Sequence, residues 1–99
     1  MKIIEANTFF KRLFGLTFKT NLEYGIIFYN CRSVHTFFMK CNIDIFILNK
    51  SNEIIEFYPN IKKNKIIISH LKDSYSVLEL PVNSSKYYHL KDIIKIERP

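Results

Sequence analysis

The sequence predicts a mainly β (α+β) fold: a small, strongly bent sheet or partly closed barrel, with one N-terminal helix packed on it. Short apolar runs, some alternating and some continuous, are separated by turn-forming residues, a pattern typical of β-strands. Only one stretch, near the N-terminus, places apolar residues at helical spacing. Many short strands with so little helix favour a compact sheet that bends or partly closes.

Length and composition limit the number of domains and the class of protein that the chain can be. The chain has 99 residues, 47% of them hydrophobic, so we expect one globular domain spanning residues 1–99. The N-terminus has no apolar run of signal-peptide length, and no segment is long enough to span a membrane. Cys31 and Cys41 form no C-x-x-C pair, which fits reduced thiols in a cytoplasmic protein.

The first elements are a strand over residues 2–5 and the single helix. Asn7 or Thr8 can cap a helix whose apolar residues within 9–14 fall on one face. Gly15 ends this helix. The amphipathic pattern predicts that the helix lies over an end or a face of the sheet.

Three strands are expected next, over residues 25–29, from about Val34, and over 43–48. The last has the strongest pattern, because alternation divides it between two faces. Ile43, Ile45 and Ile47 fall on one face, and Asp44, Phe46 and Leu48 fall on the other.

The second half of the chain continues in strands. A turn at residues 49–52 leads into a strand over 53–58, and Pro59 is expected to close this hairpin. The remaining expected strands, which bring the total near eight, are 66–69, 74–80 with Pro81 as its stop, and 92–97.

Taken together, several motifs resemble the domain of unknown function 192 family, also called uncharacterised protein family 0127. The motifs are Arg12-Leu13-Phe14-Gly15-Leu16, Gly25-Ile26-Ile27-Phe28, His35-Thr36-Phe37 with Met39 and Ile43-Asp44, and Val77-Leu78-Glu79-Leu80-Pro81. The middle block is similar to the branch whose pattern reads H-T-F-x-M-x-x-x-I-D. The resemblance extends from about Ala6 to Ile96 and departs from the pattern at Asn42, usually proline, and at Asn83 and Lys91, usually glycines.

The resemblance implies a small, mainly-β, barrel-like domain of bacteria or archaea with a helix packed against it. It implies no established activity and no cofactor. Branch members are often companions of secretion or pilus-assembly genes, which implies an accessory role.

Asp44 and His35 are the candidate chemical groups, because they lie within otherwise apolar, strand-forming sequence. An imidazole beside a carboxylate can form an acid/base pair. Alternatively, Asp44 is structural and accepts backbone N–H groups or the Arg12 guanidinium. Arg12 can pair with Asp44 or Glu79, or bind an anionic ligand. The set Cys31, Cys41, His35 and Asp44 matches no standard zinc spacing, so no metal site is expected.

Two classes of function follow. In the first, a binding module holds a small anionic ligand or a peptide segment at a mouth near Arg12, His35, Met39 and Asp44. In the second, a hydrolase-like enzyme uses His35 and Asp44 as base and orienting acid, which requires both side chains to be exposed and within hydrogen-bond reach. We favour the binding module, as a monomer or weak dimer.

The net charge of +6 also raises the question of whether the chain binds nucleic acid. Most lysines are scattered, however, which disfavours nucleic-acid binding. The one dense run, Lys62-Lys63-Asn64-Lys65, is either a solvated loop or a patch that binds phosphate or acidic groups. Tyrosines 58, 75, 87 and 88 either line a groove or cover the sheet surface.

Overall fold

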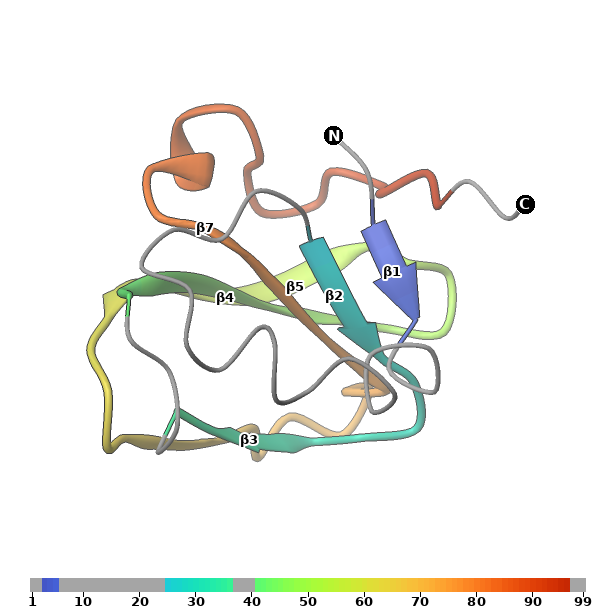
Figure 1. The fold of residues 1–99 in the computed structure, drawn as a ribbon. Coiled ribbons are helices and arrows are strands. Elements are labelled where there is room, and N and C mark those ends of the chain that lie inside the picture. Colours follow the sequence, from blue (N-terminus) through green and yellow to red (C-terminus); the bar gives the residue numbers. More distant parts are fainter. Residues whose placement is uncertain (1–2, 6–24, 37–40, 97–99) are drawn as a thin grey trace.

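The computed structural model describes residues 3–5, 25–36 and 41–96 (Figure 1). The described residues form seven strands and one short 3₁₀ helix. Their bounds are β1 Ile3–Glu5, β2 Gly25–Phe28, β3 Ser33–His35, β4 Ile43–Leu48, β5 Ile54–Ile61, β6 Ile66–Ile68, β7 Ser76–Pro81 and η1 Ser84–Lys86. The predicted mainly-β class is confirmed, and the helix predicted over 9–14 lies outside the described residues.

Two sheets make up the fold. The larger has the strand order β1-β2-β7-β4-β5, and the smaller pairs β3 with β6. All pairings are antiparallel except that of β1 with β2. Among the described strands, the edges β1 and β5 do not pair with each other, so the larger sheet is open and forms no closed barrel.

The core forms two layers, one on each face of the larger sheet, and β4 contributes to both. One cluster contains Ile26, Ile43, Ile45, Ile47 and Val77, with Val34 of β3 and Ile67 of β6 packed against it. The other contains Ile27, Phe46, Leu48, Ile54, Leu78, Leu80 and Ile94, with Tyr88 packed against it. Residues 82–96 therefore cover one face and the β3–β6 sheet covers the other (Figure 1). The alternation predicted for 43–48 is confirmed.

The expectation that Pro59 closes the hairpin is wrong, because β5 continues through it to Ile61. β5 is an edge strand, where proline costs no ladder hydrogen bond. The pairing also contains a bulge: Ile43 is opposite Ile61 and Ile45 is opposite Tyr58, so two residues of β5 face one residue of β4.

The expected last strand, 92–97, is also wrong in its described part. Its one β-bridge joins Ile93 to Glu53, and Ile94 is buried against the sheet. Three backbone hydrogen bonds also hold the segment to residues 52–54: Lys91 N–H to Ile54 O, Ile54 N–H to Asp92 O, and Ile94 N–H to Asn52 O. Lys91 has a φ of 74°, which interrupts the extended chain just before this segment. The segment is therefore bonded to the start of β5 and covers an apolar face, but it forms no regular strand.

Asn83 and Lys91, the two positions where the resemblance implies glycine, both have a left-handed backbone conformation. Asn83 has a φ of 75° and Lys91 has a φ of 74°. Glycine adopts this conformation without cost, asparagine tolerates it, and lysine is strained in it. The turns therefore persist without glycine, and the strain is concentrated at Lys91.

We expect Lys91→Gly to raise the free energy of unfolding by about 1 kcal/mol, because relief of the left-handed strain outweighs the entropy that glycine adds to the unfolded chain. Urea denaturation measures the effect. The matched variant Asn83→Gly should gain less. An equal gain, or a loss at Lys91, would contradict the strain argument.

Candidate functional site

The four predicted binding residues have different positions relative to the described structure. Arg12 and Met39 lie outside the described residues. His35 is exposed at the end of β3, and Asp44 is 1% exposed within β4.

Asp44 anchors two irregular segments to the sheet. Its Oδ1 accepts a hydrogen bond from the backbone N–H of Asn60 at 2.8 Å, and its Oδ2 accepts one from Ser85 N–H at 2.9 Å. Asn60 lies in the bulge of β5 with a φ of 53°, and Ser85 lies in η1. These contacts match the structural alternative, in which a buried carboxylate accepts backbone N–H groups.

The structure does not bring His35 and Asp44 together on one face. Asp44 shares its face of β4 with Phe46 and Leu48, the face that residues 82–96 cover. His35 belongs to the β3–β6 sheet, which packs against the opposite face through Val34. Asp44 is also not exposed, so the geometry required of an acid/base pair is not met.

Glu79 is a second buried carboxyl. It lies opposite Ile26 on one side and Ile45 on the other, and it is 3% exposed. It points to the opposite face from its neighbours Leu78 and Leu80, and that face is buried as well. Burial raises the pKa of Glu79 from 4.5 to about 8, so the group is largely neutral at pH 7.

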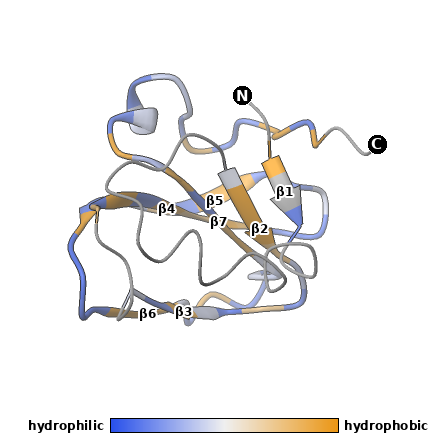
Figure 2. Ribbon diagram, in the orientation of Figure 1, coloured by the Kyte–Doolittle hydropathy of each residue, from blue (hydrophilic) through white to orange (hydrophobic). Residues whose placement is uncertain are grey.

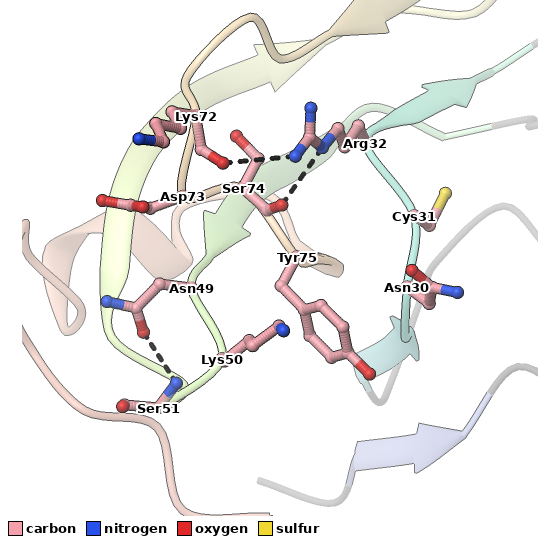
Figure 3. Close-up of a pocket in the computed structure, with 10 residues that line it drawn as sticks. All are labelled: Asn30, Cys31, Arg32, Asn49, Lys50, Ser51, Lys72, Asp73, Ser74 and Tyr75. Atoms are coloured by element: carbon pink, nitrogen blue, oxygen red, sulfur yellow. Dashed lines mark hydrogen bonds between the residues drawn. The ribbon is translucent and has the colours of Figure 1, made fainter.

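A polar pocket of about 650 Å³ lies where three segments of the chain meet (Figure 3). Its lining residues are Asn30, Cys31, Arg32, Asn49, Lys50, Ser51, Lys72, Asp73, Ser74 and Tyr75. The first three follow β2, the next three form the β4–β5 turn, and the last four precede β7. None of them belongs to the predicted binding set, although the sequence raised Tyr75 as a possible groove residue and Cys31 in a metal set that was not expected.

Backbone hydrogen bonds hold the three segments together. Cys31 N–H donates to Tyr75 O and Tyr75 N–H donates to Leu48 O, both at 2.8 Å. The Arg32 guanidinium adds two hydrogen bonds: Nε donates to Ser74 O and Nη2 donates to Lys72 O, both at 3.2 Å (Figure 3). The fork of Arg32 thereby fixes the loop that precedes β7.

The β4–β5 turn is organised by one side chain. Asn49 Oδ1 accepts hydrogen bonds from Ser51 N–H at 2.9 Å and Glu53 N–H at 3.0 Å. Asn52 has a φ of 61°, a conformation that asparagine tolerates. This turn presents Lys50 to the pocket, where its Nζ lies 5.6 Å from the centre of the Tyr75 ring.

The charge of the pocket lining is positive. Arg32, Lys50 and Lys72 oppose a single carboxylate, Asp73, and all four are exposed to solvent. Figure 3 shows the Lys50 side chain pointing toward the ring of Tyr75, while the Lys72 side chain points away from Arg32. An anion entering the pocket would meet donors from different segments.

A hydrogen-bonded network lies behind Ser74. Its Oγ contacts Ser69 Oγ, which donates to Glu56 Oε1, and Tyr58 OH donates to Glu56 Oε2 at 2.7 Å. The hydrogen bond to Glu56 raises the pKa of Tyr58 above 10.0. The Glu56 carboxylate is therefore held by protein donors and does not line the pocket.

The pocket lining offers binding groups but no reactive pair. It contains no histidine, and the Cys31 thiol donates to Ser33 O at 2.9 Å. Across the described residues, no group of three or more histidine, cysteine or acidic side chains is placed to hold a metal ion. No helix in the described part of the chain is long and apolar enough to cross a membrane.

Sequence reasoning missed this pocket because its residues come from three loops distant in the chain. Two partial signals were present. The turn at 49–52, which contains Lys50, was predicted, and Tyr75 was one of four tyrosines considered for a groove. Nothing in one sequence shows that Arg32 meets the loop at 72–74.

Fold and pocket together define a two-layer β domain with a basic pocket built from loops. The chain belongs to the DUF192 family, described as uncharacterized ACR, whose family model matches residues 1–97. The predicted family is therefore confirmed, while the branch with the H-T-F pattern stays a prediction. Family membership assigns no activity.

A known relative is likewise named only by its family. A UPF0127 protein of Thermococcus sibiricus (strain DSM 12597 / MM 739) is 38% identical over 58 residues, which cover 52% of this chain and 37% of that protein. The match thus spans little more than a third of that relative's length.

Two solved structures share the fold. A protein of unknown function from Novosphingobium aromaticivorans has a TM-score of 0.63 at 16% identity, covering 85% of this chain and 64% of its own. A protein from Sinorhizobium meliloti, proposed to be a transcription regulator, has a TM-score of 0.71 at 16% identity, covering 94% and 78%. At this identity the likeness concerns the fold alone.

Proposed function

We propose that this domain is a binding module that holds a small anionic ligand, carrying a carboxylate or a phosphate, in the loop pocket. The observation that carries the proposal is the lining itself: Arg32, Lys50 and Lys72 against one carboxylate, Asp73, around about 650 Å³. This volume suits a small molecule.

Lys50 is the central ligand-binding group of the proposal. The turn organised by Asn49 positions Lys50 over the Tyr75 ring. Part of the conformational entropy of the Lys50 side chain is therefore already lost before a ligand arrives. An exposed cation–π contact is worth only about 0.5–1 kcal/mol, which an anion can outweigh. Tyr75 can at the same time contact an apolar part of the ligand.

The proposed location differs from the predicted mouth near Arg12, His35, Met39 and Asp44. Both Asp44 oxygens are occupied by backbone N–H groups, so Asp44 supports the fold. A role for Arg12, His35 or Met39 in binding stays a prediction.

A binding module also fits the observations better than the hydrolase-like alternative. That alternative needs His35 and Asp44 exposed together, and Asp44 is buried on the face opposite the β3–β6 sheet. We include in the proposal the cytoplasmic location and the accessory role beside secretion or pilus assembly that the family branch implies. A pocket lining with no histidine, and with its cysteine thiol hydrogen-bonded to Ser33 O, suits such a role.

The test is a titration of the ¹⁵N-labelled chain with inorganic phosphate and, separately, with citrate, at physiological ionic strength. We expect Lys50→Gln to weaken the binding of the better probe by about ten-fold or more, because a charge-assisted hydrogen bond is lost. The control Lys95→Gln removes one exposed charge outside the pocket lining. Equal weakening in both variants would show attraction to net charge and would contradict the proposal.

A further inference from the structure

β6 presents an apolar, exposed strand at the edge of the smaller sheet. Ile66 is 59% exposed and Ile68 is 51% exposed, whereas Ile67 between them packs into the core. Among the described strands, β6 pairs only with β3. One edge of β6 is therefore open within the described part of the chain.

The register decides which backbone groups point to that open edge. Thr36 N–H donates to Lys65 O at 2.9 Å, and Ser69 N–H donates to Arg32 O at 2.8 Å. Hydrogen-bonded pairs alternate along an antiparallel ladder, so Ile67 is the residue of β6 that bonds to β3. The N–H and C=O groups of Ile66 and Ile68 point outward, beside their own exposed side chains.

Within its three residues, β6 has no proline, bulge or charged side chain, three of the features that usually prevent strand addition. Edge strands are commonly protected by proline, a bulge or a charged residue within the strand. β5, an edge of the larger sheet, has both Pro59 and the bulge at Asn60. β6 consists of three isoleucines in regular register.

The charge around β6 indicates what kind of chain it would accept. The sequence from 62 to 72 contains four lysines and no acidic residue, and all four lysines are exposed: Lys62, Lys63, Lys65 and Lys72. Figure 2 shows the hydrophobic strand continuing from the hydrophilic loop that precedes it. A second copy of this chain would bring like charges together, whereas an acidic segment would be attracted.

We propose that the open edge of β6 binds an extended acidic segment of a partner protein, which adds a third strand to the β3–β6 sheet. The added backbone pairs with Ile66 and Ile68, its alternate apolar side chains cover these two isoleucines, and its acidic ends face the lysines on either side. The two proposals share Lys72, which also lines the anion pocket, but the strand pairing would stand if that pocket bound nothing.

The test uses fluorescence anisotropy with a labelled synthetic peptide that alternates valine and threonine and carries two glutamates at each end. We expect saturable binding by the full chain, weakened about ten-fold or more by the double variant Ile66→Lys, Ile68→Lys. Because both side chains are exposed, this variant should fold, as circular dichroism will verify. Ile93→Lys, at an isoleucine 66% exposed elsewhere, is the matched control and should bind as the parent does.

Two modified peptides test separately the contributions of backbone pairing and of charge attraction to the binding. The same peptide N-methylated at alternate residues cannot complete the ladder and should not bind. A peptide with lysines in place of the glutamates should bind more weakly. The proposal is overturned if the double variant binds like the parent, if the N-methylated peptide binds equally, or if sedimentation shows that copies of this chain associate through Ile66 and Ile68.

Discussion

Asp44→Asn is expected to lower the free energy of unfolding by about 3 kcal/mol, because it disrupts a buried carboxylate that accepts two backbone hydrogen bonds. The amide that replaces it offers one acceptor oxygen and one NH₂ group. Either Asn60 N–H or Ser85 N–H then faces a donor and loses its partner. The Asp44 side chain holds both the β5 bulge and η1, so the substitution should destabilise both segments together.

Urea denaturation of the parent and of Asp44→Asn measures this loss. Asp92→Asn is the control, because Asp92 accepts one backbone N–H, from His89, with a side chain that is 46% exposed. It should cost less than about 1 kcal/mol. A neutral or stabilising Asp44→Asn would indicate that this acid is kept at a cost to stability, as a functional group is.

Glu79→Gln is expected to change both the stability and its pH dependence. The pKa of Glu79 is about 8 in the folded protein and near 4.5 when the chain unfolds, so the folded state binds more protons between these values. The parent should therefore lose stability as the pH rises from 4.5 to 8. At pH 7 the accumulated loss is about 3 kcal/mol.

Glutamine stays neutral throughout that range and does not carry this loss. We expect the variant to be more stable than the parent by about 3 kcal/mol at pH 7 and to match it near pH 4, as measured by urea unfolding across pH. The measurement at pH 4 serves as the internal control. A variant that is less stable than the parent at pH 7 would show that a charged Glu79 has a stabilising partner.

Local pattern was enough to predict most of the sheet. The alternation in 43–48 placed Asp44 correctly beside Phe46 and Leu48, because side-chain direction in a strand depends only on parity. The predicted end of the hairpin strand at Pro59 was wrong. Whether a proline ends a strand depends on which neighbours the strand has, and the sequence does not show that β5 is an edge.

The function of individual carboxyls was harder to predict than their position. Asp44 and Glu79 both lie in strands that are buried on two faces, but one has two N–H donors and the other lies between isoleucines. Those partners come from other strands and from η1. The pocket was missed for the same reason, because Arg32, Lys50 and Tyr75 meet only after three loops have been brought together.

The central claim is that the loop pocket binds small anions, and a chemical-shift map tests it most directly. The ¹⁵N-labelled parent is titrated with inorganic phosphate, and amide shifts are followed across the chain. Saturable shifts concentrated at 30–32, 49–51 and 72–75 are predicted. Shifts that do not saturate, or that follow the exposed lysines at 62–65 and Lys95 equally, would contradict the claim.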